Sequence, residues 1–180
     1  MFPGVVSSYH LHHVAGKVIA LAEFQAFGRD YARDTVRNAK ALGAALAERG
    51  FDVLAADRGF TQSHQVVTRH GGADSGAGAR AAQTLEAAGI ITNMNMLPGD
   101  TKPLHPSGLR LGVQELTRVG AGPADMQTIA AFYDRVLHKG DDPKQVRNDV
   151  AAFRADFQTV KYCFNDGDQG GYEFHELVRA

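Results

Sequence analysis

The sequence is poor in several features that would mark a special class of protein. It holds one cysteine, Cys163, in 180 residues, which excludes an internal disulfide and fits a reducing compartment. Its apolar runs fall well short of the roughly 18–20 residues that a membrane-spanning helix needs, so we expect no membrane partner. No basic segment followed by an apolar one opens the chain, so we expect no signal peptide and a cytoplasmic location.

Charge and histidine are also unremarkable in their arrangement. Nineteen basic and 20 acidic side chains leave a formal net charge of −1, which argues against nucleic acid as the main partner. His10, His12 and His13 lie close together, but neither an i,i+4 pair nor a nearby cysteine accompanies them, so we expect no metal site. The apolar content of 44% is enough for the core of one ordinary domain.

The first half of the chain predicts two helices. Residues 11–24 are apolar on nearly every side, and a helix of this kind must be covered on several faces. Phe27 and Gly28 are expected to end it. A second, longer helix is expected over residues 29–49, with Gly50 as its C-terminal stop.

The rest of the chain alternates between short strands and helices. We expect strands at residues 51–55, 65–68, 90–93 and 109–111, and helices at 77–88, from 123 to about 137 and from 143 to about 160. This order predicts an α+β fold, in which a small, largely antiparallel sheet carries helices on one face.

One stretch, residues 107–112, places a single arginine between two leucines and two glycines. On a strand, Leu109 and Leu111 point to one face and Arg110 to the other. The planar guanidinium matches the two oxygens of a carboxylate, so Arg110 is a candidate binding residue. On the local pattern alone, a surface arginine on an edge strand is the favoured interpretation.

The same stretch, Ser-Gly-Leu-Arg-Leu-Gly, resembles the Ser-Gly-Ile-Arg-x-Gly segment of serine hydroxymethyltransferases, which use pyridoxal phosphate. Further motifs of that family occur in the same order, at residues 2–4, 12–17, 36–42, 48–51 and 88–95. The resemblance covers roughly residues 2–137 and corresponds to only the last part of the family's chain.

The resemblance implies a fold and a division of the chain. Residues 28–160 would form the C-terminal small domain of a fold-type-I pyridoxal-phosphate enzyme, including its long connecting helix, and residues 161–180 a tail. Residues 1–27 would complete a large domain that a partner supplies. The family's cofactor-binding lysine lies upstream of Phe-Pro-Gly, here residues 2–4, and no lysine of this chain has the family's Thr-x-x-Lys context. We therefore expect no catalytic residue in this chain.

The resemblance also assigns roles to particular residues. Arg110 would bind the α-carboxylate of an amino acid. Asn95 matches an asparagine beside the family's folate, which makes tetrahydrofolate a possible second substrate, although a turn asparagine is equally compatible. Ser7 and Ser8 replace a Gly-Gly pair near the cofactor phosphate of a neighbouring subunit, where they would bind phosphate or cap the following helix. His64 matches a family histidine and is interpreted as structural.

Together these expectations describe the C-terminal half of a split enzyme in a hetero-oligomer. It would make or break the Cα–Cβ bond of β-hydroxy-α-amino acids, by hydroxymethyl transfer, aldol cleavage or transaldolase chemistry. The enzyme would be active only with an N-terminal chain that carries the lysine and shares the pyridoxal phosphate. The alternative is a non-catalytic remnant that binds a full-length relative and regulates or stabilises it.

Overall fold

The structure, a computed structural model, describes Gly4 and residues 10–164. Four short strands form one antiparallel sheet in the order β1-β2-β4-β3. The strands are β1 (Asp52–Val53), β2 (Gln65–Arg69), β3 (Asn93–Asn95) and β4 (Gly108–Gly112). The helices are α1 (Leu11–Glu48), α2 (Ala77–Ala87), α3 (Gln114–Arg118), α4 (Pro123–Leu137) and α5 (Pro143–Ala155), with the 3-10 turn η1 (Ala56–Arg58).

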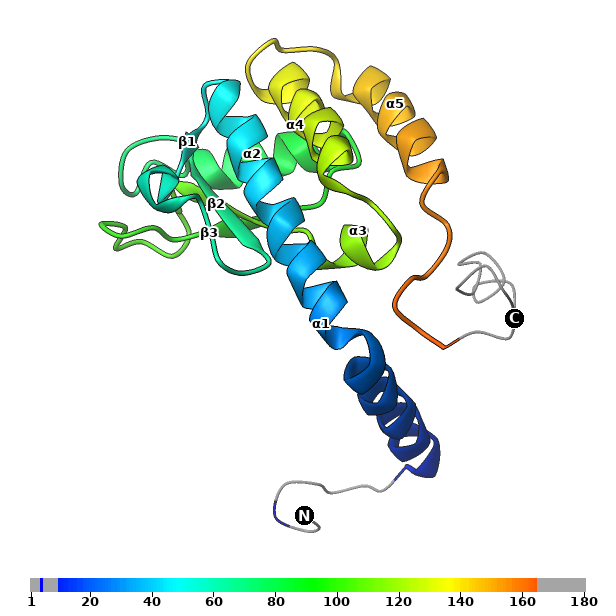
Figure 1. The fold of residues 1–180 in the computed structure, drawn as a ribbon. Coiled ribbons are helices and arrows are strands. Elements are labelled where there is room, and N and C mark those ends of the chain that lie inside the picture. The colour runs from blue at the N-terminus through cyan, green and yellow to red at the C-terminus, as the bar shows by residue number, and fades with distance from the viewer. Residues whose placement is uncertain (1–3, 5–9, 165–180) are drawn as a thin grey trace.

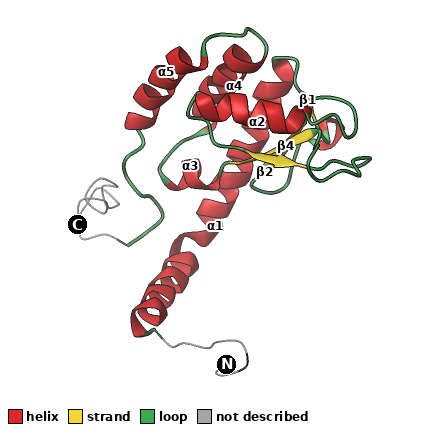
Figure 2. Ribbon diagram, turned by 180° about the vertical axis from the view of Figure 1, so that it is seen from behind, coloured by secondary structure: helices red, strands yellow, loops and turns green. Residues whose placement is uncertain are grey.

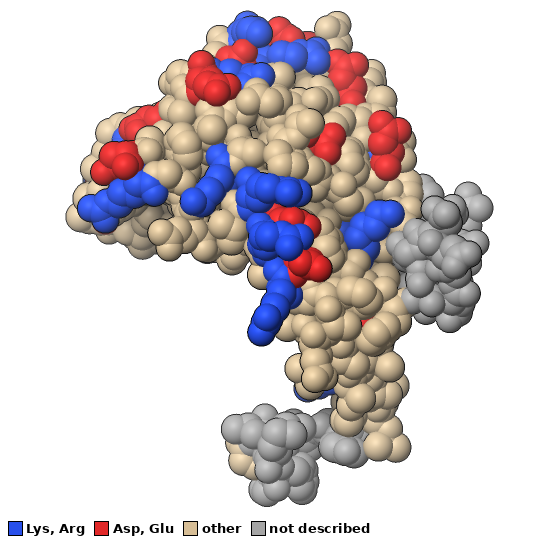
Figure 3. Space-filling view, in the orientation of Figure 1, with Lys and Arg blue, Asp and Glu red and all other residues tan. Residues whose placement is uncertain are grey.

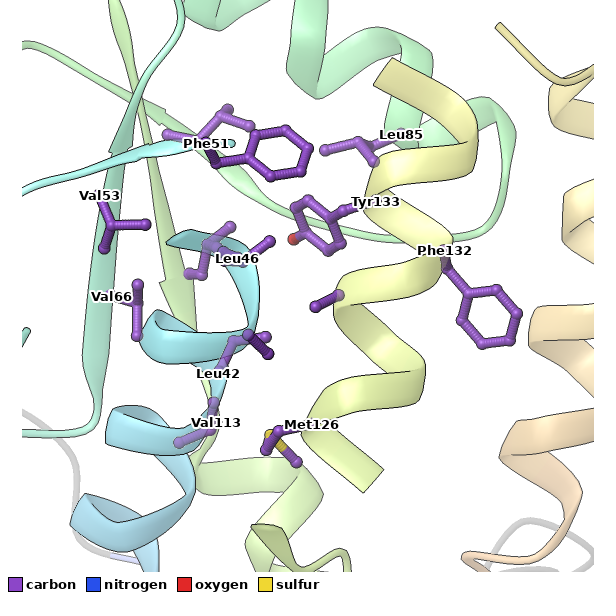
Figure 4. Packing of buried hydrophobic residues seen from close by; sticks show 14 of the residues in the cluster. Leu42, Leu46, Phe51, Val53, Val66, Leu85, Val113, Met126, Phe132 and Tyr133 are labelled. Atoms are coloured by element: carbon purple, nitrogen blue, oxygen red, sulfur yellow. The ribbon is translucent and has the colours of Figure 1, made fainter. Parts of the chain in front are cut away.

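The helices α1 and α2 pack on one face of this sheet, α4 packs against both of them, and α5 lies outside α2 and α4 (Figure 1). The other face carries no helix within the described residues. Leu109 and Leu111 of β4 are buried on the helix side, where they join one apolar core with Val66 of β2 and Leu85 of α2. Leu46 and Tyr133 meet in the middle of this core (Figure 4). The predicted α+β fold is confirmed.

The helix α1 runs unbroken through the predicted break at Phe27 and Gly28, so the expectation of two helices is wrong. A glycine inside a helix costs only about 1 kcal/mol relative to alanine. Gly28 is buried, and a Cβ there would lie 2.9 Å from the Phe24 ring, so neighbouring side chains take the space that the missing side chain leaves. The result is one helix of 38 residues.

The two halves of α1 have different surroundings. From Gly28 onward it contributes eight buried residues, among them Asn38, whose Nδ2 donates to Thr117 Oγ1 and the Ala121 carbonyl at 2.9 and 2.8 Å. The first half projects away from the sheet and the other helices in both views (Figures 1 and 2). Its surface is almost wholly uncharged, in contrast to the body (Figure 3). Its large apolar side chains are exposed, between 37% and 72%: Leu11, Val14, Val18, Ile19, Leu21 and Phe24. We call residues 11–24 the apolar half of α1.

Several smaller features differ from the sequence prediction. The strand β1 spans only Asp52–Val53 rather than residues 51–55. The strand β3 begins at Asn93 rather than at residue 90, because the Ile90 N–H bonds to the Leu85 carbonyl and closes α2. The helix α3 was not expected; the Asn38 side chain of α1 donates to the Thr117 hydroxyl within it and to the Ala121 carbonyl just after it. The helix α5 ends at Ala155 instead of continuing to about residue 160.

Gly78 allows α2 to approach β4 closely, which gives a direct test of the packing. A Cβ at Gly78 would lie 2.3 Å from the backbone oxygen of Gly108. We expect Gly78→Ala to destabilise the chain by about 3 kcal/mol or more in urea unfolding, because this overlap outweighs the roughly 1 kcal/mol that alanine gains in a helix. Gly72→Ala is the control, since nothing lies within 4 Å of its Cβ position. Equal stability of the two variants would contradict the observed packing.

Candidate functional site

Arg110 lies at the centre of β4, on the face of the sheet that carries no helix. The side chains of β4 alternate as expected, with Leu109 and Leu111 buried and Arg110 exposed. The strand is paired on both sides, since Arg110 stands opposite Val67 of β2 and Asn93 of β3. The edge-strand interpretation is therefore wrong, and Arg110 has a rigid base on an inner strand.

A polar cavity of about 380 Å³ surrounds Arg110. Its walls come from β2, β3, β4 and the start of α3, and include His64, Gln65, Asn93 and Gln114. Among the described residues no aspartate or glutamate forms an ion pair with Arg110. Glu115 also lines the cavity but forms no ion pair with Arg110, so the guanidinium faces the cavity with its hydrogen-bonding groups open to an external carboxylate.

Asn95 lies on the same face as Arg110, but it does not line that cavity. It stands opposite Gly108, and its Nδ2 donates to the neighbouring Met96 carbonyl at 3.0 Å. That bond is the local backbone contact expected of a turn asparagine, and it leaves the amide oxygen available. Asn93, two residues earlier, lines the cavity instead. The sequence contains a signal for this: in a strand, the Asn-x-Asn alternation places Asn93 on the same face as Asn95.

His64 and Gln114 connect the cavity to α1. The His64 carbonyl accepts from the Val113 N–H at 3.2 Å, and the Tyr31 hydroxyl donates to the Gln114 carbonyl at 3.0 Å. An apolar hollow of about 280 Å³ adjoins them and reaches Phe24 in the apolar half of α1. The open face of the sheet and the projecting helix therefore border one continuous surface.

Other candidate groups do not join this site. Ser7 and Ser8 lie outside the described residues. No lysine within the described ranges lines the Arg110 cavity. In the same part of the chain, no group of three or more His, Cys, Asp or Glu is placed to hold a metal ion, and none of the helices combines the length and apolarity that crossing a membrane requires.

Two aspartates that the sequence analysis did not identify hold the loop between β3 and β4. The Asp100 carboxylate accepts from the backbone N–H groups of Asp74, Leu97 and Ser107 at 2.7–2.9 Å and from the Ser107 hydroxyl. Asp74 in turn accepts from the N–H groups of Thr101 and Lys102 and from the Thr101 hydroxyl. These donors favour the ionised form, so the pKa of each carboxyl lies below its ordinary value, that of Asp100 far below it.

We call the hydrogen-bonded carboxylates of Asp74 and Asp100 the aspartate clamp. Because their pKa values are lowered in the folded chain, they make its free energy of unfolding depend on pH in the acid range. A lowered folded-state pKa contributes stability that is fully present above the unfolded value, near 3.9, and is lost as the pH falls through the folded value. We expect Asp100→Asn to unfold at lower urea concentration than the native chain at pH 7. The gap between them should shrink below about pH 4, where the carboxyl begins to protonate in the unfolded native chain while it stays ionised in the folded one. A gap that is constant from pH 7 to pH 3 would contradict a role for the ionised carboxylate.

Comparisons with known proteins identify relatives of this chain. A family model described as serine hydroxymethyltransferase matches residues 1–133. The chain is 54% identical over 169 residues to a serine hydroxymethyltransferase of Thermococcus gammatolerans, an alignment that covers 93% of this chain and 40% of that protein. It is 49% identical over 180 residues to the enzyme of Methanopyrus kandleri, covering 99% and 41%.

Among solved structures, the chain is similar to L-threonine transaldolase from Pseudomonas fluorescens. The TM-score is 0.82 at 32% identity, and the match covers 98% of this chain and 39% of the other. The chain therefore spans about 40% of the length of the relatives that it matches.

Proposed function

Because the chain belongs to the serine hydroxymethyltransferase family, we propose that it forms the C-terminal small domain of a pyridoxal-phosphate enzyme that acts on β-hydroxy-α-amino acids. The reaction makes or breaks their Cα–Cβ bond, by hydroxymethyl transfer, aldol cleavage or transaldolase chemistry. A second chain supplies the large domain and the cofactor-binding lysine. The observation that carries this proposal is Arg110, which faces an open polar cavity and forms no ion pair in the described part of the chain.

Arg110 binds the α-carboxylate of the amino acid through two parallel N–H···O bonds. A side chain on an inner strand is well suited to this, because the pairing with β2 and β3 fixes the position of its backbone. Asn93 and Gln65 line the same cavity and offer amide groups that orient the substrate. Holding the carboxylate from one side sets the direction in which the remaining bonds of Cα point.

The residues of the cavity suit a substrate carboxylate better than the cofactor, since no described lysine lies there. Pyridoxal phosphate, when bound, supplies an electron sink for cleavage or formation of the Cα–Cβ bond. Ser7 and Ser8 are assigned to its phosphate, and Asn95 to a second substrate such as tetrahydrofolate, through its available amide oxygen.

The apolar half of α1 provides the surface on which the second chain docks. Six large apolar side chains are exposed there, and one soluble chain rarely leaves so continuous a patch uncovered. Obligate interfaces bury more than about 2,000 Å². We expect the partner to cover the apolar half of α1 with an interface of that size. In this proposal the partner is the large-domain chain, which makes the enzyme a hetero-oligomer.

A reconstitution experiment tests which of the two chains carries the cofactor-binding lysine. The chain alone, mixed with pyridoxal phosphate and borohydride, is expected to give no stoichiometric adduct on a single lysine, because no lysine of the cavity is available. Adding the large-domain segment of the Thermococcus gammatolerans relative as a separate chain should give a reducible adduct on that segment's lysine and cleavage of a β-hydroxy-α-amino acid. A stoichiometric adduct on one lysine of this chain alone would overturn the split-enzyme proposal.

A further inference from the structure

A second cavity, of about 490 Å³, lies at the other end of β2 from Arg110. It opens between the end of β2, the start of α2 and the end of α4. Basic side chains from all three places line it: Arg69 and His70, Arg80, and His138. None of the residues that line the Arg110 cavity belongs to it.

One arginine, Arg80, retains hydrogen-bonding capacity toward this cavity. Arg80 Nη1 donates to the Ser75 carbonyl at 3.1 Å, and no carboxylate in the described residues forms an ion pair with Arg80. Arg69 forms an ion pair with Asp52 through Nε, at 3.4 Å, and its strand position points to the face without helices, so Arg69 lines the cavity only at its rim. The Arg80 guanidinium matches the oxygens of a phosphate group.

The imidazoles are held in place by their surroundings. The His138 ring stacks on Phe51 with centroids 4.1 Å apart. Its Nδ1 lies 3.2 Å from Asp134 Oδ1, and its Nε2 has no hydrogen-bond partner among the described residues. Asp134 also pairs with Lys139 at 2.9 Å, so its charge is shared. His70 Nε2 lies 2.9 Å from the Thr68 hydroxyl. The basic groups are therefore fixed around the cavity by neighbouring contacts.

We propose that this cavity binds a small phosphorylated metabolite, with Arg80 holding the phosphate group and His138 lying beside it. A volume of about 490 Å³ exceeds what a bare phosphate fills, so the ligand is a phosphate monoester with an organic remainder. Asp52 is the only carboxylate that lines the cavity, and it is engaged by Arg69.

The site is separate from the proposed catalytic one. Gln65, which lines the Arg110 cavity, and Arg69 lie four positions apart on β2, about 13 Å along a strand. No residue of the apolar half of α1 lines the second cavity. The inference therefore does not depend on the split-enzyme proposal, and its test needs only the chain itself.

The test is a calorimetric titration of the 180-residue chain with β-glycerophosphate at constant ionic strength, with inorganic phosphate and sodium chloride as comparison solutes. We expect saturable binding at one site for the monoester, stronger than for inorganic phosphate, and none for chloride. Arg80→Gln should weaken binding about tenfold or more, because hydrogen bonds to charged groups are lost. Arg58→Gln, at an arginine 85% exposed on η1, is the matched control and should bind as the native chain does.

Several results would overturn the proposal. They are binding that does not saturate, an affinity for inorganic phosphate equal to that for the monoester, or equal weakening by Arg80→Gln and Arg58→Gln. Circular dichroism checks that each variant is folded. If Arg80→Gln does not fold, Arg80→Lys takes its place, because lysine keeps the positive charge but lacks the planar guanidinium. We expect Arg80→Lys to bind the monoester more weakly than the native chain does at the same chloride concentration. Native affinity in Arg80→Lys would then count against the site.

Discussion

Replacing Arg110 by alanine is expected to weaken amino-acid binding by more than a hundredfold in the reconstituted enzyme. The substitution removes both N–H donors that the guanidinium offers to the carboxylate. The substrate carboxylate is then unpaired in a partly enclosed cavity. Arg110→Lys keeps the charge but loses the second hydrogen bond, which is worth about 1.5–3 kcal/mol, so the expected loss is about tenfold to a hundredfold. Titrating amino acid against the cofactor absorbance in each variant measures both effects.

The cofactor spectrum without amino acid should be nearly the same in all these proteins, because this proposal assigns the cofactor to other residues. Arg147→Ala, at an exposed arginine of α5, serves as the control and should leave amino-acid affinity unchanged. If Arg110→Ala binds amino acid as well as the native enzyme, with assembly and cofactor intact, Arg110 has no role in carboxylate binding. The non-catalytic remnant that binds a full-length relative would then be the better account of the chain.

The direction of Arg110 was predictable because a strand reverses its side chains at every residue. Leu109 and Leu111 carry that periodicity in the sequence, and the structure places them in the core. The same local pattern does not reveal the number of neighbouring strands. The pairing of Arg110 with both Val67 and Asn93 depends on segments about 43 and 17 positions away, which a local pattern does not contain.

The break predicted at Gly28 fails for a related reason. Local propensity counts a glycine as a penalty of about 1 kcal/mol, but burial of the following turns of α1 against α4 and the sheet outweighs it. The clamp of Asp74 and Asp100 was missed because each carboxylate binds backbone groups of a loop 26–28 residues away. An aspartate in a loop is common, and its partners appear only when the fold brings the two loops together.

The apolar half of α1 should determine assembly, so charging it is expected to separate the two chains. Val18 and Leu21 are 59% and 71% exposed and lie three positions apart, on one side of the helix. Losing a well-packed interface side chain costs ~2 kcal/mol, and a buried, unpaired carboxylate adds to that cost. The double variant Val18→Asp/Leu21→Asp should therefore bind the large-domain chain at least about a thousandfold more weakly than the native chain. Analytical ultracentrifugation of the mixed chains measures this.

Leu104→Asp is the matched control, because Leu104 is 81% exposed but lies in the loop between β3 and β4. It should assemble as the native chain does. The double variant should also keep its urea midpoint, since neither Val18 nor Leu21 belongs to the core of this chain. Native-like assembly of the double variant would show that the partner docks elsewhere. Loss of folding together with loss of assembly would show that the projecting helix supports the small domain itself, and its exposed side chains would then need a different explanation from an interface.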